Sequence, residues 1–264
     1  MTTNDSRFVS DLQIISALGS LAASAPVTLP DRVFAHWASA PSRLGEVFVA
    51  FTGAGVQFVR PSESVHGDVE EFARKYRARF VRPLQQATAV PAGVLPALRG
   101  RPARNLHLDL AGLTAFEQAV LGATRRIPAG QTRPYSWVAR EAGSPRAIRA
   151  VGTVLARNPV PLLVPCHRVV CADGAIGRYA FGSVHKEELL RGEAVNLDEI
   201  QALARHGVHY LASDTTGIVC FPSCRDARRV TPTHRRGFST LACAVAAGYR
   251  PCRTCRPGVE ELGA

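Results

Sequence analysis

The sequence predicts an α+β multidomain protein with a small α/β domain first, a mainly helical domain with a helix-turn-helix second, and a small cysteine-rich α+β domain last. Three observations support this class. Two strand-like runs flank a glycine turn in the first domain, capped helices follow one another between residues 114 and 158, and all seven cysteines lie at or after residue 166. A chain of 264 residues has room for two or three such domains. We expect them to span residues 1–104, 105–195 and 205–260.

The first domain shows strand and helix signals but indicates no chemistry. Residues 47–51 and 56–59 are apolar runs on either side of a Gly-containing turn, which predicts a hairpin. Asp68 is a suitable N-cap for a helix whose apolar residues keep helical spacing as far as Phe80. The alternation of leucines with polar residues over 106–110 predicts one more strand.

Three helices are predicted in the second domain. Thr114 and Glu117 have the spacing of a capping box and open the first helix. The second helix spans residues 135–141, and the third begins with Ser144 as its N-cap and ends at Asn158. The short turn between the second and third helices predicts a helix-turn-helix.

The third predicted helix has a basic outer face with little bulk. Ile148, Val151 and Leu155 share one face, which we expect to point inward, while Arg146 and Arg149 lie off it. A helix with small side chains and two arginines can approach a DNA backbone closely. Taken alone, the pattern fits a solvated surface helix better, and the neighbouring motifs are what favour contact with DNA.

Cys166 stands between a proline and a histidine in the run Val-Pro-Cys-His-Arg-Val-Val of residues 164–170. A thiolate is a strong nucleophile at neutral pH, and a neighbouring His and Arg lower the pKa of a thiol. The apolar surroundings predict that Cys166 lies at the end of a buried strand. A structural core cysteine is the alternative, because free Cys is often buried. We interpret Cys171 as a bystander and Cys243 as a packed small side chain.

The basic excess is concentrated in the second domain. The chain has a formal net charge of +11, and 11 basic against five acidic side chains fall within residues 122–193. A compact domain with such an excess favours a polyanion such as nucleic acid as its partner. Arginine richness can also follow from the base composition of a genome, so the clustering carries more weight than the total.

No apolar stretch reaches the roughly 18 to 20 residues needed to cross a membrane. Residues 14–25 are mildly apolar, but the acidic residues before them argue against a signal peptide, and we expect an ordinary helix there. The absence of a disulfide framework across the chain fits the same conclusion. The sequence therefore predicts a cytoplasmic protein.

Two close cysteine pairs dominate the third domain. Cys220 and Cys224 are separated by three residues and Cys252 and Cys255 by two, with about thirty residues between the pairs. This spacing predicts a tetrahedral four-sulfur zinc site. A domain of this size has too little core to fold alone, so the ion would stabilise it. Disulfides are the less suitable interpretation for cytoplasmic thiols.

Several blocks around Cys166 occur together in one order and spacing. They are Ile-Pro-Ala-Gly-Gln-Thr at 127–132, Pro-Tyr-Ser-Trp-Val-Ala at 134–139, Arg-Asn-Pro-Val-Pro at 157–161 and Asp-Gly-Ala-Ile-Gly-Arg-Tyr at 173–179. With the Pro-Cys-His-Arg core, residues 106–193 resemble the active-site domain of the O6-alkylguanine-DNA alkyltransferases, the methylated-DNA–protein-cysteine methyltransferases. The resemblance implies irreversible transfer of an alkyl group from O6-alkylguanine, or O4-alkylthymine, to Cys166, once per molecule and without a cofactor.

The resemblance implies roles in alkyl transfer for five residues. His167 would ionise Cys166 through a water molecule, with Glu193 orienting the imidazole. Tyr135 would assist the departure of the base. Asn158 would brace the turn that carries the cysteine, through hydrogen bonds from its side chain to the backbone.

A second set of residues is expected at the DNA. Arg149 matches the family's residue that fills the gap left when the target nucleotide is rotated out of the duplex. Tyr179 and Gly177 fall on the loop that walls the guanine pocket, and Arg146 would join Arg149 at the phosphate backbone. Ala180 stands where many relatives have serine, which bears on the alkyl groups that fit. The expected partner is double-stranded DNA with alkylated bases, bound by a monomer.

The third domain carries a second resemblance. Residues 215–224 and 246–257 are similar to the Ada-type metal-binding domain, which moves a methyl group from a phosphotriester onto the first zinc-bound cysteine, here Cys220. Four thiolates on one zinc carry a net charge of −2, which keeps sulfur nucleophilic, and methylation removes one negative charge. A purely structural zinc module that adds DNA affinity is the alternative.

Two other functions stay open. A zinc-stabilised DNA-binding regulator with an inactive alkyltransferase domain would bind DNA and leave Cys166 unmodified; it is disfavoured because the chain retains the residues named for transfer. A cysteine hydrolase would need an oxyanion hole, for which the sequence gives no signal. Lys186 aligns with a lysine near the family's site, although a lone lysine is more often a surface charge.

Overall fold

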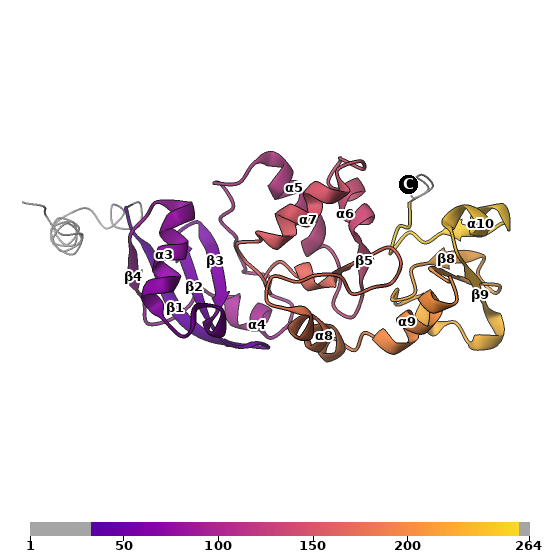
Figure 1. Ribbon diagram of the computed structural model, residues 1–264, viewed down its shortest axis with the longest axis horizontal. Coiled ribbons are helices and arrows are strands. Elements are labelled where there is room, and N and C mark those ends of the chain that lie inside the picture. Colours follow the sequence, from indigo (N-terminus) through magenta and orange to yellow (C-terminus); the bar gives the residue numbers. More distant parts are fainter. Residues whose placement is uncertain (1–32, 259–264) are drawn as a thin grey trace, which may run out of the picture. The chain divides into compact units, whose positions relative to one another are not determined.

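The computed structural model describes residues 33–258, which form two compact units. The helix predicted over residues 14–25 lies outside the described residues. Figure 1 shows helices and sheets in both units, as the α+β class predicts, whereas the three-domain division stays a prediction. Within the described chain, the first unit comprises residues 33–41, Gly45–Leu95 and Arg104–Asp109, and the second comprises Ser42–Leu44, Pro96–Ala103 and residues 110–258.

A four-stranded sheet and one long helix form the first unit. The elements are β1 (Ala35–Ser42), β2 (Gly45–Thr52), β3 (Gly55–Pro61), a 3-10 turn (Ser62–Val65), α3 (Val69–Phe80) and β4 (Leu84–Gln86). The strand order is β3-β2-β1-β4, with β2 and β3 antiparallel, which confirms the predicted hairpin. Phe72 and Tyr76 of α3 join Phe48 and Phe58 of the sheet in one buried core.

Two predictions in this unit have opposite outcomes. Asp68 caps α3 through its side chain, and the helix runs as far as Phe80, as predicted. The strand expected over 106–110 is wrong, because this segment makes only one parallel bridge, between Leu108 and Val56. An alternating run extends into a strand only where a neighbour continues the hydrogen-bond ladder.

Helices dominate the middle of the chain. They are α4 (Val94–Leu98), α5 (Ala115–Arg125), α6 (Tyr135–Glu141), α7 (Ile148–Ala156), α8 (Ser183–Gly192) and α9 (Leu197–Arg205). Thr114 and Glu117 form the predicted capping box at α5, and α6 has the predicted bounds. Across residues 33–258, every helix is too short or too polar to cross a membrane.

The helix after the turn begins later than predicted. α7 starts after Ala147, which offers no side-chain cap, because the N–H of Ala147 bonds to the carbonyl of Ser144 at 2.9 Å and closes a separate turn. Ser144 is therefore not the N-cap. Ile148 is 40% exposed and not inward-facing, whereas Val151 and Leu155 are buried as predicted.

A 3-10 turn, Cys166–Arg168, carries the candidate nucleophile in place of the predicted strand end. The apolar run before it folds back on itself, with a bridge between Pro161 and Val164, so it cannot continue as a strand. The turn leads into β6 (Val169–Val170), which pairs in parallel with β5 (Arg133–Pro134). This pairing brings the turn close to the start of α6.

A second four-stranded sheet follows α9. Its strands are β7 (Tyr210–Ser213), β8 (Ile218–Cys220), β9 (Arg235–Phe238) and β10 (Arg250–Pro251), in the order β10-β8-β7-β9, with 3-10 turns at Ala227–Arg229 and Pro232–His234 and a helix α10 at Leu241–Ala246. Cys243 in α10 is exposed. The prediction that it is packed is wrong, since α10 turns Leu241 and Ala244 inward instead.

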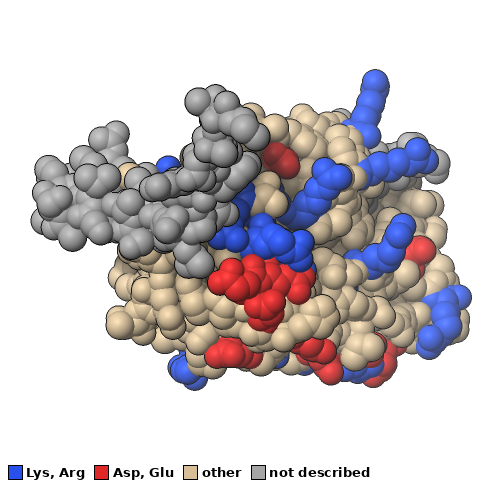
Figure 2. Space-filling view, turned by 60° about the vertical axis from the view of Figure 1, so that its left-hand side comes forward, with Lys and Arg blue, Asp and Glu red and all other residues tan. Residues whose placement is uncertain are grey.

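Charged side chains of both signs share the face drawn in Figure 2. Lys and Arg side chains gather near its centre, and Asp and Glu side chains lie directly beside them. The excess of basic residues in the sequence therefore does not make this face uniformly positive.

Candidate active site and metal centre

Cys166 lines a cavity of about 650 Å³, and only 6% of its surface is exposed. The volume lies within the range of pockets that hold small ligands. Other lining residues come from α6, from α7 and from the loop before α8. Tyr135, Arg149 and Tyr179, three residues predicted from the sequence, line the cavity together with Cys166 and Ala180.

Asn158 holds the turn that carries Cys166. Its Nδ2 atom donates to the carbonyl of Val164 at 3.0 Å and lies 3.3 Å from Cys166 Sγ. Its Oδ1 accepts the N–H of Val160 at 3.0 Å. The side chain is buried, so these partners take the place of water. A donor aimed at the sulfur favours its anionic form.

Several donors converge on the carboxylate of Glu193, the residue after α8. His167 Nε2 lies 3.1 Å from Oε1. Arg168 binds both oxygens, with Nε 2.8 Å from Oε2 and Nη2 2.9 Å from Oε1. Arg43, which belongs to the same compact unit, donates to Oε1 at 2.8 Å, and the N–H of Gly130 donates to Oε2 at 3.3 Å. A bidentate arginine of this kind fixes the carboxylate in one orientation.

This cluster favours an ionised Glu193 beside a neutral His167. Burial opposes ionisation of Glu193, but hydrogen bonds from His167 and Arg168, together with the charge of Arg168, outweigh it and lower the pKa of the carboxyl group far below its ordinary value. Burial lowers the pKa of His167, and Glu193 acts against this effect. A carboxylate only accepts hydrogen bonds, so Nε2 carries the imidazole proton. Nδ1 is a buried acceptor with no partner among the described residues.

Two phenol groups line the cavity. Burial raises the pKa of Tyr135, with Cys171 and Cys166 adding to the effect and Arg178 opposing it. Burial, with a further contribution from Cys166, also raises the pKa of Tyr179. Both phenols therefore stay protonated at neutral pH and can donate hydrogen bonds. The hydroxyl of Tyr179 is buried and has no partner within the described chain.

Lys186 is completely buried, so a position as a surface charge is excluded. Its ammonium group donates to the carbonyl of Val169 at 2.6 Å and to that of Arg178 at 3.4 Å. Burial lowers the pKa of Lys186 to about 8, while Cys166 and Cys171 oppose the change. The lysine thus places a titratable cation behind the cavity.

The predicted DNA-contacting residues fall into two groups. Arg149 lines the cavity, whereas Arg146 is exposed in the turn before α7 and does not line it. Gly177 has a φ of 74°, and a Cβ atom there would lie 3.1 Å from Cys171 Sγ and 3.7 Å from the hydroxyl of Tyr135. A side chain at this position would crowd the floor of the cavity, so glycine keeps it open.

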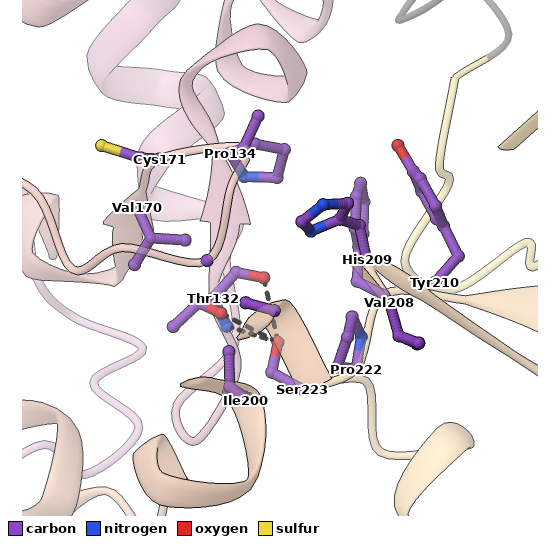
Figure 3. Close-up of a pocket in the computed structure, with 14 residues that line it drawn as sticks. Thr132, Pro134, Val170, Cys171, Ile200, Val208, His209, Tyr210, Pro222 and Ser223 are labelled. Atoms are coloured by element: carbon purple, nitrogen blue, oxygen red, sulfur yellow. Dashed lines mark hydrogen bonds between the residues drawn. The ribbon is translucent and has the colours of Figure 1, made fainter. Parts of the chain in front are cut away.

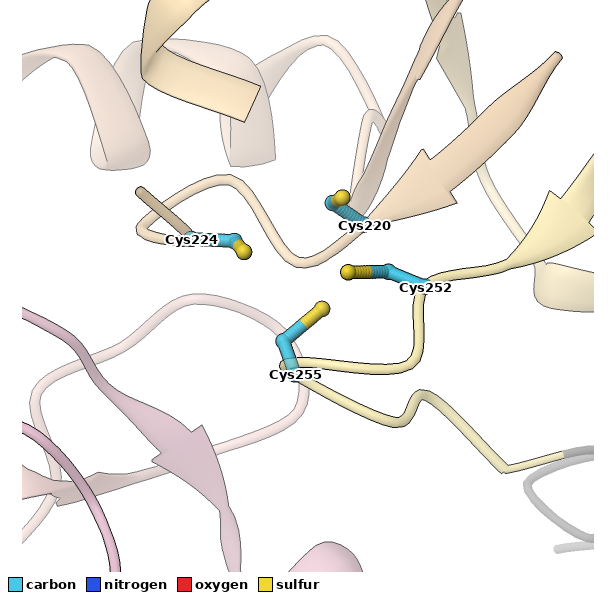
Figure 4. A group of neighbouring side chains, drawn as sticks. All are labelled: Cys220, Cys224, Cys252 and Cys255. Atoms are coloured by element: carbon cyan, nitrogen blue, oxygen red, sulfur yellow. The ribbon is translucent and has the colours of Figure 1, made fainter. Parts of the chain in front are cut away.

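Four buried cysteines converge, as their spacing predicts (Figure 4). The sulfur atoms of Cys220, Cys224, Cys252 and Cys255 all lie within 4.8 Å of one another, which suits tetrahedral coordination. The N–H of Thr254 donates to Cys252 Sγ at 3.3 Å. The donor set therefore fits a zinc ion held by four thiolates.

Cys220 also lines a second cavity, of about 570 Å³, to which the other three cysteines do not contribute. The polar side chains that line this space include several hydroxyl groups, one arginine and one carboxylate. They belong to Ser213, Thr215, Thr216, Thr231, Arg229 and Asp226, and His234 lines the space as well. One member of the cysteine cluster is thus next to a space that a polar or anionic ligand could enter.

Two segments that are distant in sequence meet at Thr132 and Ser223 (Figure 3). The N–H and hydroxyl of Thr132 lie 2.9 and 3.0 Å from Ser223 Oγ, which in turn donates to the Thr132 carbonyl at 3.1 Å. Both line a small cavity of about 50 Å³. Trp137 Nε1 donates to the carbonyl of Cys255 at 3.0 Å. No pattern in the sequence predicts this meeting.

Two arginines that contact Glu193 were not predicted from the sequence. Arg168 stands directly after His167 in the cysteine motif, and this adjacency could have indicated a shared carboxylate. Arg43 gives no such signal, because it lies 150 residues before Glu193 and in the first predicted domain. Contacts of that span are visible only once the chain is folded.

Two family models match the chain in succession. Residues 115–195 match the family described as 6-O-methylguanine DNA methyltransferase, DNA binding domain. Residues 201–258 match the family described as the metal binding domain of Ada. The first segment contains Cys166 and Glu193, and the second contains all four clustered cysteines. We call them the transferase segment and the metal segment.

Known proteins are similar to different parts of the chain. A Mycobacterium tuberculosis (strain H37Rv) protein named methylated-DNA–protein-cysteine methyltransferase is 33% identical over 158 residues, 60% of this chain and 92% of the relative. The Escherichia coli (strain K12) bifunctional transcriptional activator/DNA repair enzyme Ada is 46% identical over 91 residues, 34% of this chain and 25% of the relative. The chain spans about half to two thirds of the length of several other methyltransferase relatives.

One solved structure has a comparable arrangement of its backbone. It is the crystal structure of Mycobacterium tuberculosis OGT in complex with DNA, with a TM-score of 0.50 and 29% sequence identity. The match covers 63% of this chain and 98% of the other.

Proposed function

We propose that this chain, which belongs to the family of methylated-DNA–protein-cysteine methyltransferases, repairs O6-methylguanine in DNA by accepting the methyl group on Cys166. One observation carries the proposal. Cys166 is a nearly buried sulfur that lines a cavity of about 650 Å³ and lies within hydrogen-bonding distance of Asn158. Tyr135, Arg149 and Tyr179 line the same cavity, so a nucleophile, a donor and a cation surround one space.

The proposed transfer is an SN2 displacement. The Cys166 thiolate supplies the electron pair of a new S–C bond, the bond between the methyl carbon and guanine O6 breaks, and its electron pair leaves with the base. Tyr135, kept protonated by burial, donates a hydrogen bond to the departing base and offsets its negative charge. The base then takes up a proton, equivalent to the one that Cys166 released. The thioether is stable, so each molecule reacts once and needs no cofactor.

His167 is the proposed acceptor of the Cys166 proton. Its Nδ1 atom is a buried acceptor that finds no partner within residues 33–258, which supports a path through one water molecule from the adjacent cysteine. Glu193, 3.1 Å from Nε2, would stabilise the imidazolium that forms. Arg168 holds Glu193 in place for this purpose.

A base in a duplex cannot reach a sulfur at this depth, so the proposal includes rotation of the target nucleotide into the cavity. Arg149, exposed yet lining the cavity, is suited to fill the gap in the duplex, and Arg146 to contact phosphate. Tyr179 and Gly177 would wall the bound base. The proposed partner is double-stranded DNA with alkylated bases, bound by a monomer. O4-methylthymine, whose ring is smaller than that of guanine, is a second proposed substrate.

Intact-mass measurement after incubation with a duplex that contains one O6-methylguanine tests the proposal. We expect a gain of one methyl group, mapped to the peptide with Cys166, and the same gain from an O4-methylthymine duplex. Cys166→Ala should bind the duplex and gain nothing. Retained transfer in Cys166→Ala would refute the assignment. A wild-type chain that binds DNA and stays unmodified would instead support a DNA-binding regulator.

The thiols also bear on where the protein acts. The seven cysteines all lie within residues 33–258, and no disulfide joins any of them there. Cys166 must stay reduced to act as a nucleophile, and the four clustered cysteines must stay reduced to bind metal. We therefore include a reducing compartment, the cytoplasm, in the proposal.

The cavity beside Cys220 favours a second activity, the repair of methyl phosphotriesters. Sγ of Cys220 would attack the methyl carbon, an S–C bond would form, and the C–O bond would break with its electron pair left on the phosphodiester oxygen. A bound zinc ion would keep the sulfur deprotonated at neutral pH. Arg229, which lines the same cavity, would contact the phosphate.

An oligonucleotide with a single methyl phosphotriester distinguishes repair from a structural zinc site. We expect a methyl group on the peptide that contains Cys220, in the wild type and equally in Cys166→Ala. Arg229→Met should slow the reaction without changing zinc content. A zinc-loaded chain that gains no methyl group from this substrate would show that the site is structural only.

A further inference from the structure

Arg133 is the bulkiest of the fully buried side chains in the described part of the chain, with 1% of its surface exposed. Its Nη1 donates to the carbonyl of Thr132 at 2.7 Å and its Nη2 to Gln131 Oε1 at 2.8 Å, and Nε has no partner in the described chain. A guanidinium group stays charged in proteins, so its burial requires a compensating negative charge nearby. No carboxylate within residues 33–258 forms an ion pair with it.

Two aromatic rings beside Arg133 belong to residues that adjoin or contact the cysteine cluster. Its guanidinium carbon lies 5.5 Å from the ring centre of Phe221 and 5.6 Å from that of Trp137. Phe221 directly follows Cys220 in the sequence. The indole of Trp137 donates to the carbonyl of Cys255 at 3.0 Å. Two of the four clustered cysteines are thus tied to the surroundings of this arginine.

A third cysteine is linked through the backbone next to Arg133. Thr132 hydrogen-bonds to Ser223, which directly precedes Cys224, and Figure 3 shows these bonds. Thr132, Ser223 and Cys224 are all buried, so water does not compete for these hydrogen bonds. The transferase segment therefore covers the cysteine cluster with residues 132–137.

We infer that Arg133 is the counter-charge of the zinc–thiolate centre and that the bound metal thereby fastens the metal segment to the transferase segment. Four thiolates and one zinc ion carry a net charge of −2, which a single buried guanidinium reduces to −1. Opposite charges attract strongly where water is excluded. Zinc retention then depends on a residue outside the metal segment, and Arg133 acts as a positioning residue for the metal.

The same contact extends to the turn that carries Cys166. Arg133 and Pro134 form β5, whose partners in register are Val169 and Val170 of β6. β6 directly follows the 3-10 turn with Cys166. Metal loss that displaces Arg133 would thus release the strand pair next to the proposed methyl acceptor.

Zinc affinity of the full-length chain tests the inference through competition with the chromogenic chelator 4-(2-pyridylazo)resorcinol. Arg133→Met removes the charge and keeps most of the side-chain volume, and we expect it to weaken zinc affinity about 10- to 100-fold, as the loss of an outer partner of a metal site does. Arg133→Lys should lose less. Arg125→Met removes an exposed charge at the end of α5 and should change nothing. Equal affinity in Arg133→Met and the wild type would overturn the inference.

Hydrogen exchange of the wild-type chain gives a second test that does not depend on how a variant folds. Removal of zinc with EDTA should speed exchange at residues 131–137 and 166–171 as well as around the four cysteines, and leave residues 47–59 unchanged. Faster exchange confined to the metal segment would contradict the inference. Neither measurement involves methyl transfer, so a failure of the proposed repair activity stays distinguishable from a failure here.

Discussion

Nδ2 of Asn158 lies 3.3 Å from Sγ of Cys166 and 3.0 Å from the carbonyl oxygen of Val164. One buried amide group therefore supports both the candidate nucleophile and the backbone before it. Reactivity of the sulfur and stability of the turn should depend on the same side chain.

Asn158→Ala should slow methyl transfer about 10-fold or more, equivalent to about 1.4 kcal/mol in activation free energy. The variant leaves the N–H of Val160 buried without its acceptor, which costs about 1–3 kcal/mol of stability, whereas the carbonyl of Val164 keeps its hydrogen bond from the N–H of Cys166. Single-turnover rates with an O6-methylguanine duplex and urea unfolding measure the two effects. Asn105→Ala, an exposed position, is the control. An unchanged rate would show that the hydrogen bond to sulfur has no role in transfer.

Glu193→Gln should lower the free energy of unfolding by about 3–5 kcal/mol. The glutamine removes the negative charge that pairs with Arg168 and Arg43, whose charges are then uncompensated. Urea titration at neutral pH measures the change. Glu187→Gln is a matched control, because Glu187 pairs with Arg191 at the surface and should contribute less than about 1 kcal/mol.

The contribution of Glu193 should disappear in acid. Its pKa in the folded state lies below the ordinary value of 4.5, so the unfolded chain binds the proton more readily. The stabilisation is therefore complete above about pH 4.5 and is lost as the pH falls further. His167, whose folded-state pKa lies below 6.5, makes stability decline from about pH 6.5 downward. Urea unfolding from pH 7.5 to 3.5 should show the wild type and Glu193→Gln converge; a constant difference would contradict the assignment.

Lys186→Met should make stability less dependent on pH in alkaline solution. The pKa of Lys186 is about 8 in the folded chain and 10.5 in the unfolded chain. Between these two pH values the unfolded chain therefore binds more protons than the folded chain. The wild type should therefore gain up to about 3 kcal/mol, relative to Lys186→Met, as the pH rises from 8 to 10.5. Thermal unfolding of both proteins across this range measures the difference. Parallel curves would mean that the buried lysine does not titrate there.

Gly130→Ala should destabilise the protein more than Gly143→Ala. Both glycines adopt a positive φ, of 74° and 75°, so alanine costs about 1–2 kcal/mol at either position. A Cβ atom at Gly130 would also lie 2.8 Å from the carbonyl oxygen of Glu193, whereas one at Gly143 meets nothing within 4 Å. Urea unfolding compares the two variants, and transfer rates should fall only in Gly130→Ala. Equal losses would show that the close approach to Glu193 is unimportant.

Local signals in the sequence predicted local structure well. The hairpin of β2 and β3, the cap of Asp68 and the capping box of Thr114 depend on neighbouring residues alone. The four-cysteine cluster was also predictable, because metal chemistry constrains both the residue type and the spacing.

The failures arose where distant parts of the chain decide the outcome. Cys166 lies on a 3-10 turn because Asn158 and the folded-back apolar run hold it there, and neither contact follows from strand-like composition. Lys186 points inward because backbone carbonyls of two other segments accept hydrogen bonds from its ammonium group. Arg43 and Arg133 find their surroundings only after folding.

The ion cluster at Glu193 has an uneven charge count. Two guanidinium groups, from Arg43 and Arg168, surround one carboxylate, and His167 beside them is neutral. Transfer of the Cys166 proton to His167 leaves this count unchanged, because the thiolate and the imidazolium carry opposite charges. A methylated sulfur beside a neutral His167 gives the same count again. The spent protein would therefore keep the local charge of the fresh one and differ from it by the volume of one methyl group on a nearly buried sulfur.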